Sequence, residues 1–256
     1  MLRMPFPEYL AIDAASKHGL ELLLRSPAHY RWAQEQPSEA SPAQALGTLA
    51  HTLILEPETA SRYLCEQVDR RTNAGKARWA EIQAEGLTLV SPDQMEAAEG
   101  MRDAVMAHPL ARVLFAAGEA EGTLLWDDEE TGLACKARPD WWNGDHDLIV
   151  DLKTASDGSF DGFSRAAGAY GYHLQAAHYM DGAIACGMKP QAFLFVVVES
   201  APPHAVAVYT MDDNTIHAGR VKIRRALNLL AECRRTNTWP GYPVEIQTLE
   251  IKPWSL

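Results

Sequence analysis

The sequence predicts an α/β (α+β) fold in which helices flank a mixed central β-sheet. Three observations carry this prediction: helix-start signals recur through residues 1–118, strand patterns fill 119–153, and a helix–strand–strand–helix order runs on to 235. Elements in this order build a sheet that helices cover on its faces. We therefore expect one domain over residues 1–256, with a mainly helical part (1–118), a sheet-containing part (119–235) and an extended tail (236–256).

The amino-terminal part carries the helix-start signals. Residues 1–12 contain two prolines and predict extended chain. Serine before proline is typical of a helix N-cap and first turn, and it occurs at residues 26–27, 41–42 and 91–92. We expect helices from each of these pairs, from Asp13 or Ser16, over Asn73–Glu85 and after His108-Pro109. A polar loop is expected over Gln34–Ala40.

Residues 119–153 predict a three-stranded antiparallel meander with strands Glu121–Asp127, Leu133–Trp142 and Asp147–Lys153. Asn143-Gly144 between the last two strands is a strong hairpin signal. Strand side chains alternate between faces, so Leu148, Val150 and Leu152 form an apolar face while Asp151 and Lys153 share the other. Asp140 on the neighbouring strand brings a second carboxylate. Two carboxylates and a lysine on rigid elements predict a site for a hard metal ion.

The remaining chain predicts two helices, two strands and a final helix. The helices cover Phe160–Gly168 and Tyr172–Gly187, and on the second of them Gln175 and Tyr179 lie four residues apart on one face. The apolar run Gln191–Glu199 predicts a strand that is buried on both faces, with Val206–Met211 as its neighbour. A last helix runs from Asp212 or Asp213 to about Arg235.

Composition sets limits on function. The net charge of −11 argues against a protein that coats nucleic acid nonspecifically, so any DNA contact needs local cations. No apolar run approaches the ~20 residues that span a bilayer, and no signal segment opens the chain, so we expect a cytoplasmic protein without a membrane partner. The four cysteines form no C-x-x-C pair, which favours small buried hydrophobes over a zinc or iron–sulfur site.

Four short motifs together resemble a known family. They are Pro139-Asp140, Asp151-Leu152-Lys153, Gly47-x-x-x-His51 upstream and Gln175-x-x-x-Tyr179 downstream. This set resembles the PD-(D/E)xK nuclease superfamily and its RecB-like branch. More narrowly, residues 8–240 are similar to the RecE-like exonucleases (the nuclease domain of exonuclease VIII and its phage relatives), as seen in 24–27, 47–51 and 131–140.

The resemblance implies a restriction-endonuclease-like core with an N-terminal helical part. It further implies a metal-dependent exonuclease that degrades linear double-stranded DNA from 5′ to 3′. Such enzymes leave 3′ single-stranded tails for a RecT-like annealing protein, and they form ring-shaped homo-oligomers, either trimers or tetramers. Mg²⁺ is the implied metal, and Mn²⁺ is expected to substitute for it.

The resemblance also assigns roles to residues. Asp140, Asp151, Lys153, Gln175 and Tyr179 would be catalytic. The metal ligands would be His51, Glu121, Asp140, Asp151 and the backbone carbonyl of Leu152. The DNA contacts do not follow from the resemblance; an acidic chain must draw them from local cations. The candidates, each of which could also be an ordinary surface charge, are Arg70, Arg71, Lys76, Arg78, Lys136, Arg138 and Arg165.

Several alternatives stay open at this point. His51 could be a hydrogen-bonded core histidine, Glu121 an exposed edge-strand residue, and the face carrying Gln175 and Tyr179 a packing surface. The rival functions are an endonuclease of the same superfamily and a noncatalytic DNA-binding scaffold for recombination.

Overall fold

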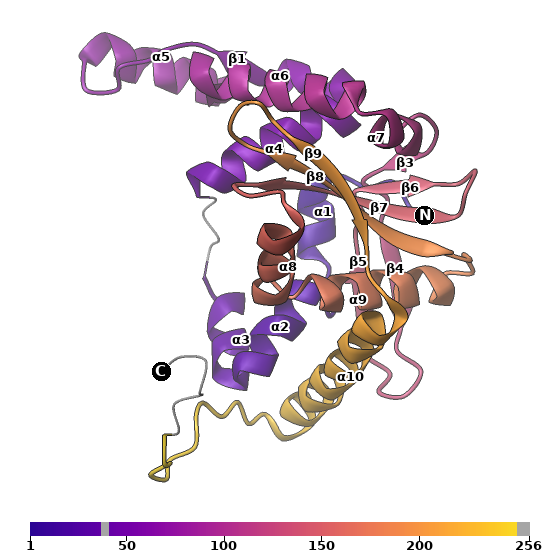
Figure 1. Ribbon diagram of the computed structural model, residues 1–256. Coiled ribbons are helices and arrows are strands. Elements are labelled where there is room, and N and C mark those ends of the chain that lie inside the picture. The colour runs from indigo at the N-terminus through magenta and orange to yellow at the C-terminus, as the bar shows by residue number, and fades with distance from the viewer. Residues whose placement is uncertain (37–40, 250–256) are drawn as a thin grey trace.

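The computed structural model describes residues 1–36 and 41–249 (Figure 1). Its first four helices are α1 (Phe6–Ala11), α2 (Lys17–Arg25), α3 (Pro27–Gln34) and α4 (Pro42–Leu55). Ser16, Ser26 and Ser41 cap the last three, each accepting a hydrogen bond from a backbone N–H in the first turn. The predicted helix starts are thus confirmed. The extended prediction holds for residues 1–5, where Leu2 forms a β-bridge with Thr123, but it is wrong for 6–11, because Pro7 lies in the first turn of α1, where its missing N–H costs nothing. Residues 37–40 of the predicted loop lie outside the described residues.

An arm follows α4 and projects from the body (Figure 1). After a 3₁₀ turn (Pro57–Arg62), it consists of β1 (Tyr63–Cys65), α5 (Asn73–Ala84), β2 (Thr88–Val90) and α6 (Pro92–Ala107). The strands β1 and β2 form a parallel pair that the sequence did not predict, because three residues are too short for a periodicity to show. The short helix α7 (Pro109–Leu114) leads back to the body.

The central sheet has the order β3-β6-β7-β8-β9 and is mixed, as predicted. Its middle strands, β7 (Leu148–Ala155) and β8 (Ala192–Glu199), run parallel, and β9 (Val206–Thr210) is antiparallel to β8. The hairpin β6 (Trp141–Asn143) to β7 turns at Asn143-Gly144 as expected.

The predicted meander is wrong in two respects. The first strand is shorter than expected, because only β4 (Leu124–Asp127) forms within it and a separate strand, β3 (Glu119–Ala120), precedes Glu121. The second strand is divided into β5 (Ala134–Ala137) and β6. β4 and β5 form a two-stranded sheet of their own, while β3 pairs with β6 in the central sheet. Pro139 has no N–H to give to a ladder, so the second strand breaks there.

Helices cover both faces of the central sheet (Figure 1). On one face, α4 and α6 pack on Val150, Leu152 and Val196. On the other, α8 (Phe160–Ala169) and α9 (Tyr172–Ala185) pack on Ile149 and Phe195. The long α10 (Asp213–Thr236) packs against α9 and α2 in a further cluster. β7 is therefore buried on both faces, which fixes the orientation of its polar side chains.

Three smaller findings complete the fold. Cys135 and Cys233 are buried as expected, but Cys65 and Cys186 are exposed, which corrects the prediction for these two. Among residues 1–36 and 41–249, no helix is long and apolar enough to cross a membrane. The tail from 238 to 249 forms neither helix nor strand; residues 250–256 lie outside the described part of the chain.

Candidate active site

β7 carries Asp151 and Lys153 on one face, as the strand period predicted. Asp151 is completely buried, and one of its oxygens accepts a hydrogen bond from the Gln175 Nε2 at 2.5 Å. Its other oxygen forms an ion pair with the Lys153 ammonium. The ammonium also lies 4.9 Å from the centre of the Tyr172 ring. The first turn of α9 therefore holds both charged groups of the strand in place.

Asp140 lies directly after the break at Pro139. Its Oδ2 accepts a hydrogen bond from the Leu152 N–H at 2.8 Å. The ladder between β6 and β7 begins at the Trp141–Val150 pair. Beyond that pair, the Asp140 carboxylate accepts the hydrogen bond of the Leu152 N–H in place of a backbone carbonyl of β6. The same oxygen lies 3.6 Å from the His51 Nδ1 on α4.

Glu121 sits in the gap between β3 and β4, with a left-handed backbone (φ 54°) that non-glycine residues rarely adopt. Its N–H donates to the Asp140 carbonyl at 3.0 Å. Its carboxylate accepts a hydrogen bond from the Arg138 Nε at 2.6 Å, and Arg138 donates in turn to the Met4 carbonyl. Glu121 is therefore a half-buried residue turned toward the site.

His51, Glu121 and Asp140 form one cluster, with a possible ligand atom from each lying within 4.8 Å of the others. Burial and the Asp151 charge raise the pKa of Asp140 to about 8. Burial and the Asp140 charge likewise raise the pKa of Glu121 to about 7. Burial, helped by the Lys153 charge, lowers the pKa of His51, so its ring is neutral and can donate a lone pair. Two crowded carboxylates and a neutral imidazole fit a divalent cation such as Mg²⁺ or Mn²⁺.

The other predicted ligands lie beside this cluster. A hydrogen bond between the His51 ring and the Leu152 backbone raises the pKa of His51, as expected when a carbonyl oxygen accepts from the ring. Both oxygens of Asp151 already have partners, Gln175 and Lys153, so Asp151 would join a metal only by exchanging one of them.

Lys153 keeps its proton in this arrangement. Burial alone would lower the pKa of Lys153, but the Asp151 and Asp140 carboxylates outweigh it and raise the pKa above its ordinary value. Burial raises the pKa of Tyr179 well above its ordinary value, and the Asp151 and Asp140 charges add to the effect; its ring lies 6.2 Å from the Phe193 ring, centre to centre.

The sequence did not predict two features of the site. One is Tyr172, whose ring lies beside the Lys153 ammonium, and the other is the ion pair of Arg138 with Glu121. Tyr172 precedes Gln175 by three residues, so helical spacing could have indicated that both face β7. Arg138 was expected to bind DNA, whereas here its guanidinium holds Glu121. No signal in the sequence predicts that pair, because it depends on the break between β3 and β4.

The fold and these residues can be compared with known families. The family model described as "PDDEXK-like domain of unknown function" (DUF3799) matches residues 17–251. The chain belongs to this family.

Two solved structures are similar to this PDDEXK-like domain. A "Putative exonuclease" from Eubacterium rectale is 15% identical, with 96% of this chain and 97% of that chain covered and a TM-score of 0.61. A phage-related exonuclease from Haemophilus somnus 129PT is 12% identical, with 74% of this chain and 95% of that chain covered and a TM-score of 0.36. At these identities the first likeness shows the fold alone. No curated protein matches the chain.

One predicted DNA contact of the PDDEXK-like domain is wrong. The Lys136 ammonium is buried and donates to the backbone carbonyls of Tyr9, Leu10 and Ile12, at 2.9, 3.2 and 2.7 Å. An ammonium has three protons, so all are used within the fold. Lys136 therefore fixes the end of α1 and has no donor left for a phosphate.

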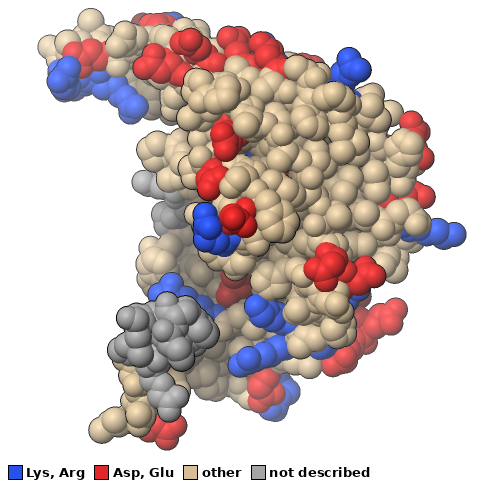
Figure 2. All heavy atoms as spheres, viewed as in Figure 1, with Lys and Arg blue, Asp and Glu red and all other residues tan. Residues whose placement is uncertain are grey.

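Four of the other predicted cations lie together on the arm. The Arg70 guanidinium stacks 4.0 Å from the Trp79 ring centre. Arg71 is highly exposed and pairs with Asp69 at 3.0 Å, and Arg78 pairs with both Glu66 and Glu81. Lys76 is exposed on α5. Figure 2 shows Lys and Arg gathered at the end of the arm and on its underside, with Asp and Glu along its upper edge. Cations thus gather locally on this underside, which is the feature that DNA binding by an acidic chain would require.

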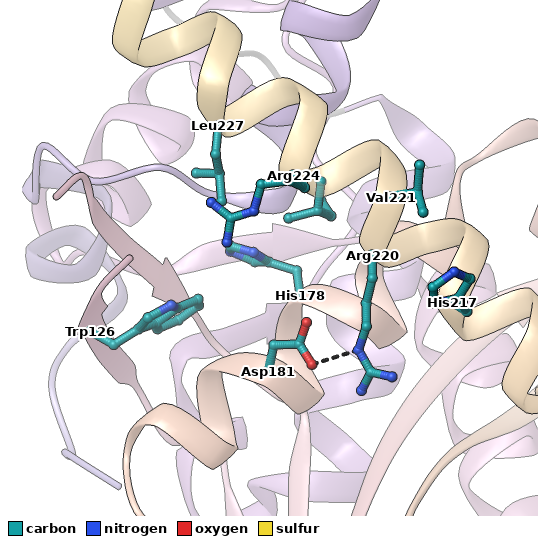
Figure 3. Close-up of a pocket in the computed structure, with 9 residues that line it drawn as sticks. Trp126, His178, Asp181, His217, Arg220, Val221, Arg224 and Leu227 are labelled. Carbon is teal, nitrogen blue, oxygen red and sulfur yellow. Dashed lines mark hydrogen bonds and ion pairs between the residues drawn. The ribbon is translucent and has the colours of Figure 1, made fainter. Parts of the chain in front are cut away.

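A cavity of about 420 Å³ between α9 and α10 lies apart from the predicted site residues (Figure 3). Its two arginines are already paired: the Arg220 Nε donates to Asp181 at 2.8 Å, and Arg224 donates to both oxygens of Asp128 at 2.8 and 2.7 Å. Because a carboxylate already pairs with each guanidinium, we assign this cavity to packing between the helices.

Proposed function

We propose that the protein is a metal-dependent exonuclease that degrades linear double-stranded DNA from 5′ to 3′ and leaves 3′ single-stranded tails for strand annealing. The observation that carries the proposal is the cluster of His51, Glu121 and Asp140 beside the Asp151–Lys153 pair on β7. The residues for cation binding and for water activation therefore meet at one place. Direction and product tails rest on the resemblance to RecE-like exonucleases.

Each residue of the site has a task in phosphodiester hydrolysis. His51, Glu121 and Asp140 would hold Mg²⁺, which when bound polarises the phosphate and lowers the pKa of water. Lys153, protonated and fixed by Asp151, would orient the attacking water and offset the negative charge that develops on the phosphate. Gln175 keeps Asp151 in position. Tyr179 would contact the scissile phosphate, a role that rests on the resemblance to RecE-like exonucleases.

The proposal extends to partners. The arm cations Arg70, Arg71, Lys76 and Arg78, together with Arg165 on α8, would hold the DNA backbone. A ring-shaped homo-oligomer, a trimer or a tetramer, would place several copies of these cations around the DNA. The 3′ tail would pass to a RecT-like annealing protein in the cytoplasm of a bacterium or a phage-infected host, and Mn²⁺ would replace Mg²⁺.

The same experiment distinguishes this proposal from two other functions. An endonuclease would use the same cluster, and a noncatalytic recombination scaffold would keep the fold without hydrolysis. Buried carboxylates crowded as Asp140 and Glu121 are costly to a fold unless a cation neutralises them, which favours an enzyme over a scaffold.

The experiment is digestion of end-labelled linear duplex and of covalently closed circles, with Mg²⁺ or with EDTA. We expect the 5′ label to be released first, closed circles to stay intact, and EDTA to stop the reaction. Asp140→Asn should remove hydrolysis while the fold persists, and Asp145→Asn, an exposed site on the same hairpin, is the matched control. Cutting of closed circles would sink the exonuclease proposal, and an inactive wild type would favour the scaffold.

A further inference from the structure

After α10 the chain returns to α3, at the end of the molecule opposite the arm (Figure 1). Trp239 anchors this returning segment, because its ring stacks on the Tyr30 ring with the centres 5.7 Å apart. The Arg31 guanidinium lies 5.7 Å from the centre of the same Trp239 ring. One residue further on, the Pro240 carbonyl accepts a hydrogen bond from the Ala28 N–H at 3.1 Å. These contacts fix the path of the segment across α3.

Three rings lie side by side on this surface. The Tyr242 ring lies 5.7 Å from the His29 ring, centre to centre. Trp32 follows His29 by three residues on α3, so both side chains project from one face of the helix. Trp32 is 64% exposed and Tyr242 is 66% exposed. One exposed aromatic residue is ordinary on a protein surface, but three neighbouring rings on an anchored segment offer a row of faces for stacking.

Two arginines flank this aromatic row, which consists of Trp32, His29 and Tyr242. The exposed Arg25 donates from its Nε to the Tyr242 hydroxyl at 3.4 Å; this acceptor is neutral, so the charge of Arg25 stays available to an anion. Arg31 pairs with Glu35 at 3.1 Å, and both side chains are more than half exposed. Exposed ion pairs contribute little to stability, so a phosphate can take the place of the glutamate.

Rings and cations in this arrangement fit single-stranded DNA. The bases of a single strand expose their faces to aromatic side chains, whereas the bases of a duplex are stacked on one another. The phosphates between the bases attract arginines. We infer that the aromatic row, with Arg25 and Arg31, binds single-stranded DNA. The inference rests on the proposed function for the source of this strand, which is the 3′ tail that digestion leaves; the tail stays on the enzyme while digestion proceeds.

The test measures binding of a dye-labelled dT oligonucleotide to the full chain in EDTA, which prevents digestion. Trp32→Ala and Tyr242→Ala should each weaken binding about 5- to 100-fold, the effect of losing one stacked base. Arg25→Gln should lower the slope of log affinity against log salt by about 0.7, the value for one phosphate of a single strand. Leu110→Ala and Arg112→Gln, both exposed on α7, are the matched controls and should bind as the wild type does.

Two further probes show whether the bases are what the rings recognise. An abasic oligonucleotide keeps the phosphates but has no faces to stack, so Trp32→Ala should bind it with the same affinity as the wild type. A covalently closed duplex circle keeps its bases paired. It should therefore also bind Trp32→Ala and the wild type with equal affinity.

The outcomes separate this inference from the proposed function. Unchanged dT affinity in both Trp32→Ala and Tyr242→Ala overturns the inference and leaves the nuclease proposal standing. An equal loss of affinity for closed duplex also overturns it, as does a change of molar mass in light scattering, since the rings then contact a second copy of the chain. A wild type that binds dT through these rings but digests no DNA with Mg²⁺ overturns the proposed function alone. If the melting temperature shows that the alanine variants do not fold, the salt slope of Arg25→Gln decides.

Discussion

Replacing Lys136 with methionine distinguishes a lysine that fixes α1 from one that binds DNA. Methionine keeps most of the side-chain volume and removes the ammonium. Three carbonyls then lose the ammonium as a donor. The Tyr9 carbonyl keeps a hydrogen bond from the Ile12 N–H at 3.4 Å, the Ile12 carbonyl keeps one from the Ala14 N–H at 3.0 Å, and the Leu10 carbonyl can turn to water. No carbonyl is left unpaired, so each lost hydrogen bond costs about 1 kcal/mol, and the free energy of unfolding should fall by about 3 kcal/mol.

Two measurements check this expectation. Urea unfolding gives the loss of stability, with Arg71→Met as the control, since that exposed side chain should change stability by less than about 0.5 kcal/mol. DNA binding, measured with Ca²⁺ in place of Mg²⁺, gives the dependence of affinity on salt. Each phosphate contact adds about 0.9 to that slope. Lys136→Met should keep the wild-type slope. A folded variant of unchanged stability whose slope falls by about one would refute the reasoning.

Three further predictions concern the cluster and its surroundings. His51→Ala should raise the Mg²⁺ concentration needed for half-maximal digestion by about 10- to 100-fold, and an unchanged Mg²⁺ titration would return His51 to a core role. Lys153→Ala should lower kcat by about 10²–10⁴ while Mg²⁺ affinity stays within a few-fold, and equal losses in both would contradict its assignment to the water. Burial lowers the pKa of His178 from 6.5 to about 4, so its contribution to stability is complete above pH 6.5 and is lost as the pH falls to about 4. Over that window the wild type should lose about 3 kcal/mol relative to His178→Gln in urea titrations, and parallel curves would contradict the shift.

The sequence predicted the site best where local periodicity decides geometry. Asp151 and Lys153 share a face because a strand alternates, and Gln175 faces them because a helix repeats near four residues. Prediction failed where distant segments meet. Strand parity placed Lys136 with Arg138 and Asp140 on one face, but it could not reveal that α1 ends beside the lysine. The division of the meander depends on Pro139 and on the left-handed Glu121, whose effects on pairing become visible only in three dimensions.

The hydrogen bond from the Leu152 amide to Asp140 makes the site observable without any substrate. This amide proton lies between the Asp140 carboxylate, which we propose as a metal ligand, and the buried strand that carries Asp151 and Lys153. Any cation that draws charge from Asp140 weakens the acceptor, and so shifts the amide resonance and alters its exchange with solvent. In a nitrogen-15 labelled sample, the chemical shift of the Leu152 amide should therefore report whether a metal ion is bound. It can be followed in protein whose hydrolytic activity has been removed at Lys153.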